Sequence, residues 1–135
     1  MIGHPYPDNL EFDFEAEVHF HRRTPEGEGR GAPPCNGYRA DFGYEGESKS
    51  NLWMVWPLQF FTEEGDVPDG QPAPWDCFAR FHILNRELRE SVHRHRLRPG
   101  VRFSILEGSK VVAHGTVTRL LSLGVGPEPR QTSEP

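Results

Sequence analysis

Residues 12–21 alternate strictly between apolar and polar side chains, and this pattern constrains the fold more than any other feature. Successive side chains of a β-strand point to opposite faces, so a period of two predicts a strand with one buried and one solvated face. The expected inward side chains are Phe12, Phe14, Ala16, Val18 and Phe20, and the expected outward ones are Asp13, Glu15, Glu17, His19 and His21. Strands of this kind are typical of antiparallel sheets and barrels.

Five further segments read as strands, at about 38–44, 52–61, 76–83, 101–106 and 110–121. Two loops rich in Gly and Pro separate some of them, at 22–36 and 62–75. Pro57 lacks an N–H, so it predicts an edge position or a bulge in its strand. Many short strands at this spacing predict an all-β fold, namely a small closed antiparallel six-stranded β-barrel.

One short helix is expected over residues 85–96, between the fourth and fifth strands, with Asn85 as its N-cap. Pro99 and Gly100 end it. Its narrow apolar stripe is expected to lie on the barrel and consists of Leu84, Leu88 and Val92. Its opposite, solvated face is expected to carry Arg86, Arg89, Glu90 and His93.

The length of 135 residues predicts one domain, at 10–123, between disordered tails at 1–9 and 124–135. The chain opens without the basic and apolar regions of a signal peptide, and no apolar run is long enough to cross a bilayer. We therefore expect a soluble, cytoplasmic protein without a membrane partner. Cys35 and Cys77 are then expected to be reduced thiols, although their pairing stays open.

Three segments and one glycine together resemble a known family. They are Phe14–Val18, Asn36–Phe42, Gly100–Val112 and Gly115. In order and spacing they are similar to the C-terminal (third) β-barrel domain of elongation factor Tu, here as a stand-alone chain. Ala40 and Asp41 replace a Pro-Gln pair of the family, and residues 45–48 are acidic where the family has an Arg-Thr-Thr-Asp segment. The family also has a short turn in place of the helix.

This resemblance implies a non-enzymatic binding module for a protein or RNA partner, such as transfer RNA or another part of the translation machinery. The chain has no Gly-x-x-x-x-Gly-Lys-Ser/Thr motif, so we expect no nucleotide and no other cofactor. A net charge of −5 argues against general nucleic-acid binding. An alternative is a decoy or immunity-type protein that imitates the surface of the elongation factor.

Arginines supply the candidate binding residues, because guanidinium groups form paired hydrogen bonds with phosphates and carboxylates. The candidates are Arg39, Arg86, Arg89, Arg94, Arg96 and Arg102. The simpler interpretation is a solvated helix face balanced by Glu87 and Glu90. We expect the exchange of Arg89, Arg94 and Arg96 for Glu to abolish partner binding and to leave folding intact.

Histidines suggest a further alternative, a small metal-binding protein or enzyme. His19 and His21 share a strand face with Glu17, about 7 Å apart at a rise of about 3.3 Å per residue. Solvent-facing histidines are the simpler interpretation, because a metal site needs further ligands that the sequence does not name.

No Gly-x-Ser-x-Gly motif or activated cysteine is found, so no catalytic residue is predicted. An exposed Trp53 or Trp75 would mark a protein-binding patch.

Overall fold

The computed structural model describes residues 9–124. The disorder expected at 1–9 and 124–135 therefore falls outside the described residues, apart from Asn9 and Gly124. Seven strands form one antiparallel sheet: β1 (Phe14–Phe20), β2 (Asp41–Tyr44), β3 (Val55–Thr62), β4 (Gly65–Asp66), β5 (Asp76–Ile83), β6 (Arg102–Glu107) and β7 (Lys110–Leu120). Their order in the sheet is β2-β6-β7-β1-β5-β3-β4. The all-β prediction is confirmed, with the two-residue β4 added inside the expected loop 62–75.

The two ends of the sheet approach each other between β2 and the start of β3. Phe42 and Trp53 exchange both backbone hydrogen bonds, at 2.9 and 2.8 Å. Further along β3, the side chain of the buried Asn36 accepts a hydrogen bond from the Phe60 N–H at 2.8 Å and donates one to the Val67 carbonyl at 2.9 Å. A side chain thus replaces a strand partner in the part of β3 that follows the bulge at Pro57.

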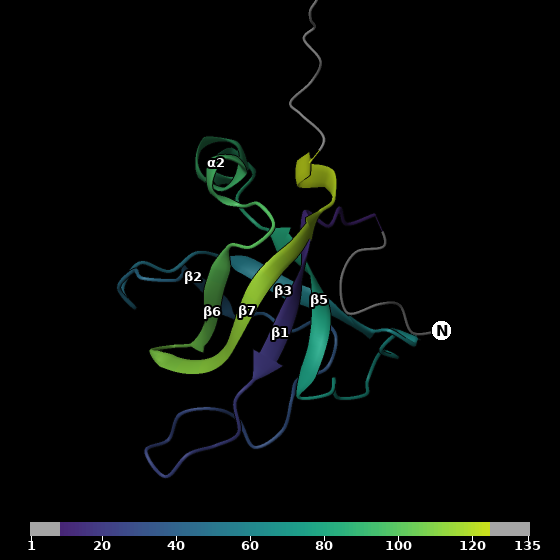
Figure 1. The fold of residues 1–135 in the computed structure, drawn as a ribbon, viewed down its shortest axis with the longest axis vertical. Coiled ribbons are helices and arrows are strands. Elements are labelled where there is room, and N and C mark those ends of the chain that lie inside the picture. Colours follow the sequence, from purple (N-terminus) through teal and green to yellow (C-terminus); the bar gives the residue numbers. More distant parts are fainter. Residues whose placement is uncertain (1–8, 125–135) are drawn as a thin grey trace, which may run out of the picture.

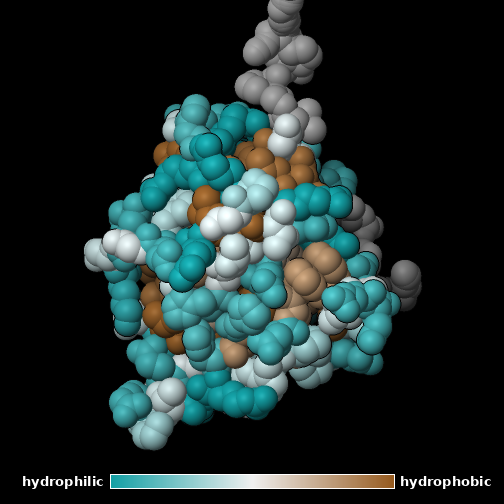
Figure 2. Space-filling view, in the orientation of Figure 1, coloured by the Kyte–Doolittle hydropathy of each residue, from teal (hydrophilic) through white to brown (hydrophobic). Residues whose placement is uncertain are grey.

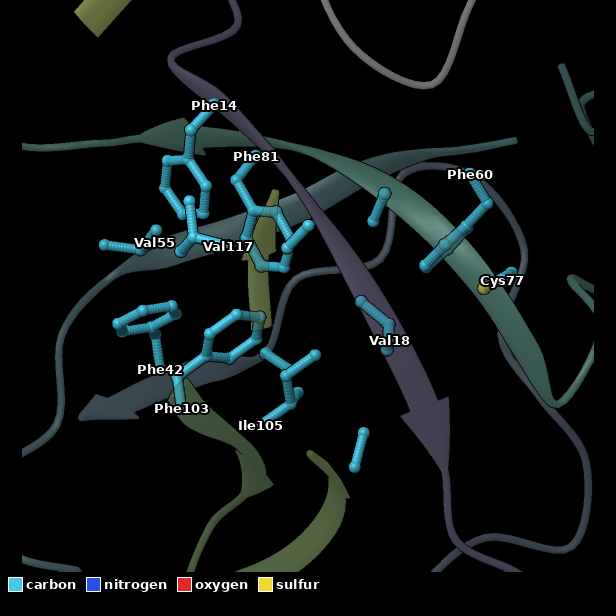
Figure 3. Close-up of a cluster of buried hydrophobic side chains, with 14 of the residues drawn as sticks. Phe14, Val18, Phe42, Val55, Phe60, Cys77, Phe81, Phe103, Ile105 and Val117 are labelled. Carbon is cyan, nitrogen blue, oxygen red and sulfur yellow. The ribbon is translucent and has the colours of Figure 1, made fainter. Parts of the chain in front are cut away.

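Aromatic rings fill the core on the inner face of the sheet. The ring centroids of Phe14 and Phe81 lie 4.7 Å apart, as do those of Phe42 and Phe103, and both pairs are stacked. Figure 3 shows these four rings converging from different strands. Burying one such ring contributes roughly 1.5–3 kcal/mol to stability. The inward face predicted for β1 is confirmed at Phe14, Ala16, Val18 and Phe20.

The helix forms where the sequence predicts it, as three short consecutive pieces: α1 (Arg86–Leu88), the π-helical η1 (Arg89–His93) and α2 (Arg94–Arg96). It lies at one end of the molecule with the short 3-10 helix η2 (Ser122–Gly124), whereas the loop after β1 extends from the opposite end (Figure 1). The Asn85 side chain caps the helix by accepting from two backbone N–H groups at 3.0 Å.

The predicted orientation of the helix is wrong. Leu84 is exposed and Leu88 and Val92 are only half-buried, whereas Arg89 and His93 are buried. The π-helical turn contains both buried residues, and hydrogen-bonding partners lie beneath each of them. Polar contacts with Asp13 and Tyr44, rather than an apolar stripe, therefore set the face that packs on the sheet.

Candidate functional site: the arginines and an exposed apolar surface

Asp13 is the partner of Arg89, and its side chain has no exposed surface, contrary to the solvated position predicted for it. One carboxylate oxygen accepts from Arg89 Nε at 2.6 Å, and the other accepts from the backbone N–H of Ile83 at 2.7 Å. Ser122 donates its hydroxyl to the first oxygen at 3.2 Å. One carboxylate thus connects β1, the end of β5, the helix and η2.

The charge of Arg89 is stabilised in place. Burial works against it, but the hydrogen bonds and negative charges of Asp13 and Glu90 outweigh that effect and raise the pKa of Arg89. With only 7% of its surface exposed, Arg89 is not available to a partner. The expectation that Arg89 can be exchanged for Glu without loss of folding is therefore corrected, because Glu would bury a second carboxylate beside Asp13.

Tyr44 and the buried His93 form a second polar contact under the helix. The Tyr44 hydroxyl lies 2.7 Å from His93 Nδ1. Burial, with a smaller contribution from the nearby Arg96, lowers the pKa of His93 to about 4. The neutral ring then accepts a hydrogen bond from the Tyr44 hydroxyl, and burial raises the pKa of Tyr44 so that the hydroxyl keeps its proton. His93 thus has a structural role that the predicted solvent-facing position did not anticipate.

The remaining arginines of the helix region also have partners. Arg86 contacts Glu11 at 3.1 Å and Asp13 at 3.2 Å, Arg94 contacts Glu90 at 2.6 Å, and Arg96 contacts Glu47 at 2.7 Å. Arg102 contacts Glu45 at 3.2 Å. The hydrogen bond from Arg94 is the largest cause that lowers the pKa of Glu90 to about 2. Five of the six candidate arginines thus have carboxylate partners, which reduces the positive charge they offer to RNA.

Arg39 is the candidate with a different environment. It is exposed, and no carboxylate of residues 9–124 contacts it. Its guanidinium lies 5.2 Å from the ring centroid of Trp56, a half-buried side chain of β3. Guanidinium groups stack favourably on indole rings, so Trp56 orders Arg39 without neutralising it. Among the described residues, Arg39 is therefore the candidate arginine whose charge has no carboxylate partner.

Two exposed apolar side chains lie beside Trp56. Among the described residues, Met54 at 53% exposure and Leu84 at 37% are the large hydrophobic side chains left exposed. They are adjacent, since the Leu84 N–H donates to the Met54 carbonyl at 3.0 Å. Met54 directly precedes β3 and Trp56 is the second residue of that strand, with the buried Val55 between them. Arg39, Met54, Trp56 and Leu84 are named the docking surface below.

The sequence did not single out Met54 and Leu84. Leu84 was assigned to the buried stripe, and Met54 follows Trp53 in an apolar run without clear alternation. Trp53 and Trp75 would have marked a patch if exposed, but both are half-buried. Trp53 packs edge-on against His93, and the Arg22 guanidinium lies 4.2 Å from the Trp75 ring centroid. The signal that could have found Met54 and Leu84 is the presence of a large apolar residue just outside each of two paired strands, before β3 and after β5.

The two candidate metal ligands, His19 on β1 and His21 directly after it, contact different partners. His19 contacts Asp76 at 2.9 Å and lies 3.7 Å from Glu17, whereas His21 Nε2 lies 2.6 Å from Nδ1 of His114. Within residues 9–124, no group of three or more His, Cys, Asp or Glu side chains is placed to hold a metal ion. The predicted set of His19, His21 and Glu17 is therefore not brought together as one ligand set.

Two hollows of the described surface lie near the histidines of the sheet. One of about 310 Å³ lies between Glu17, Asp76 and the β3–β4 turn, and another of about 220 Å³ lies beside His114 and Arg102. Figure 2 shows a mainly hydrophilic face with small brown patches.

No helix in the part of the chain that the structure describes is long and apolar enough to cross a membrane. Comparison with models of known families and with curated proteins finds no match.

Proposed function

We propose that this chain is a non-enzymatic binding module whose docking surface takes up a segment of a protein partner carrying a carboxylate next to an apolar side chain. The observation that carries the proposal is the position of Arg39 on Trp56, beside the exposed pair Met54 and Leu84. Trp, Arg and Met are enriched at protein interfaces. The unpaired charge of Arg39 is complementary to an acidic partner.

A protein partner agrees better with these contacts than RNA does. Nucleic-acid binding depends on several free cations that neutralise phosphates. Arg86, Arg89, Arg94, Arg96 and Arg102 already contact carboxylates. Exposed aliphatic side chains such as Met54 and Leu84 also find better complements on a protein than on a phosphate backbone. Recognition of transfer RNA through the six arginines is the second candidate, and it predicts binding that weakens steeply with salt.

A closed barrel similar to the C-terminal domain of elongation factor Tu is the framework of this proposal. The paired hydrogen bonds between Phe42 and Trp53 support closure between β2 and β3. Hydrogen exchange tests it, since a closed barrel protects both amides as strongly as those of β1. Fast exchange at both amides, with slow exchange in β1, would argue for an open sheet. The two free thiols favour a reducing, cytoplasmic location as part of the same proposal.

Selection from a displayed random-peptide library tests the partner chemistry. We expect enriched peptides to place Asp or Glu within two residues of a large apolar side chain. Their affinity should fall about tenfold for Arg39→Ala and for Met54→Ser, and stay unchanged for Arg119→Ala. Arg119 is a matched control because it is exposed on β7, three strands away from β3. Peptides that bind all variants equally would place the site elsewhere.

Three further outcomes separate the alternatives. Binding of a defined transfer RNA that is lost with Arg39→Ala at low salt would favour the RNA candidate. If the chain is a decoy of the elongation factor, the selected peptides should also bind the C-terminal domain of that factor. The chain and that domain should then compete for the same peptide. Sedimentation of the free protein tests whether a second copy of this chain occupies the docking surface. A dimer that Met54→Ser abolishes would overturn the acidic-segment proposal.

A further inference from the structure

Two histidines from neighbouring parts of the sheet direct ring nitrogens at each other on the outer surface. His21 Nε2 and His114 Nδ1 lie 2.6 Å apart, with the rings at an interplanar angle of 87°. His21 follows β1 directly, and His114 lies in β7, the neighbouring strand. Neither β2 nor β3 borders this pair, so it is separate from the docking surface.

We infer that His21 and His114 together bind one divalent transition-metal ion, of which Zn²⁺ is the simplest probe. Imidazole nitrogens are common ligands of zinc, nickel and copper in proteins. The site has two protein ligands, so water completes the coordination. The contact between the two rings is exposed, so water can reach the ion.

The backbone holds both ligands in place before any ion binds. The His21 N–H donates to the Val112 carbonyl at 2.8 Å, and its carbonyl accepts from Arg30 at 2.9 Å. His114 is paired with His19 on one side and with Ser104 on the other. Only the two side chains therefore have to adjust, and preorganised ligands bind more tightly than mobile ones.

The adjustment is small and needs no loss of protons from the neutral pair. A hydrogen bond between the rings places one proton between the two nitrogens. Binding moves that proton to the other nitrogen of the same ring, so that both facing nitrogens present lone pairs. Zinc–nitrogen bonds of about 2.0–2.1 Å at a tetrahedral angle separate two nitrogens by about 3.3 Å. The side chains thus need to open by less than about 1 Å from their present contact.

His19 provides the matched control because it lies on the same outer face, two residues from His21, but directs its ring toward Asp76. Calorimetric titration with Zn²⁺ should show one ion per chain. His21→Ala and His114→Ala should each weaken binding at least tenfold, whereas His19→Ala should leave it unchanged. Ring-proton NMR shifts on adding Zn²⁺ should be largest for His21 and His114.

Three results would overturn the inference. The first is no saturable Zn²⁺ binding by the wild-type chain. The second is unchanged binding by both His21→Ala and His114→Ala, which would place the ion elsewhere. The third is an equal loss for His19→Ala, which would return the site to the ligand set expected from the sequence. Circular dichroism of each variant shows that a loss of binding is not a loss of folding.

Discussion

Replacing Asp13 tests the buried ionic contact that positions the helix. Asp13→Ala removes the acceptor of the buried Ile83 N–H and leaves Arg89, a residue with 7% exposure, without its buried carboxylate partner. An unsatisfied buried N–H costs about 1–3 kcal/mol. Removing one partner of a buried ion pair costs about 3–5 kcal/mol in total. Because Arg89 keeps its contact with Glu90, we expect a loss of about 3 kcal/mol in the free energy of unfolding.

Urea unfolding followed by tryptophan fluorescence measures this loss. Glu17→Ala is the control, since Glu17 lies on the same strand with an exposed side chain, and its exchange should change stability by less than about 0.5 kcal/mol. The double variant Asp13→Ala/Arg89→Met should be more stable than the sum of the single effects predicts, because it leaves no buried charge unpaired. A cost below about 1 kcal/mol for Asp13→Ala would refute the assigned role of the carboxylate.

Four further predictions concern stability and reactivity. Phe103→Ala should cost about 3–5 kcal/mol in urea unfolding, because this ring is buried in the core; a loss below about 1 kcal/mol would place it outside. Gly115→Ala should cost about 1–3 kcal/mol, since the added Cβ would meet the Phe103 ring and lie 2.7 Å from the Glu17 carbonyl; an unchanged urea midpoint would show that the strands yield freely. Because the pKa of the buried His93 is about 4, the unfolded chain binds a proton below about pH 6.5 that the folded chain does not. The free energy of unfolding should therefore fall by roughly 3 kcal/mol between pH 6.5 and 4. His93→Gln should remove this part of the pH dependence of urea unfolding. Burial raises the pKa of Cys77 to about 12, so its thiol should resist a thiol-reactive dye at pH 8 until the protein unfolds. Because the half-buried Cys35 can also react, the labelled residue is identified by peptide mapping, and rapid labelling of Cys77 in the folded protein would contradict its buried position.

The strands were predictable because their signals are local. Alternation over residues 12–21 identifies β1, and the Asn85 cap and the Pro99-Gly100 stop bracket the helix. β4 was not predictable, because it has only two residues and both Gly65 and Asp66 are of types depleted in strands. Its pairing depends on Phe61 and Thr62 of the preceding strand, which is a contact set by the turn.

The orientation of the helix was not predictable from its own sequence. Arg89 and His93 are polar residues that periodicity assigns to solvent, yet Asp13 and Tyr44 hold them against the sheet. These partners lie 76 and 49 residues away in the chain. Burial of a charged side chain depends on a counter-charge from another element, so a single-element pattern assigns it wrongly.

The candidate site was predictable only in part for the same reason. The sequence names Arg39 among six arginines, but only the structure shows which of them contact carboxylates. Likewise, His114 lies 93 residues from His21, and the register between β1 and β7 brings them together. Residue type is available from the sequence, whereas pairing across strands is not.

An NMR titration with the tightest acidic–apolar peptide from the selection tests the proposed docking surface most directly. The three tryptophan indole N–H signals are built-in reporters, since Trp56 lies in that surface whereas Trp53 packs on His93 and Trp75 lies under Arg22. The proposal predicts that the Trp56 signal and the amides of Arg39, Met54 and Leu84 shift, while the Trp75 signal stays in place. Shifts confined to the helix arginines or to the Trp75 region, with the Trp56 signal unchanged, would contradict it.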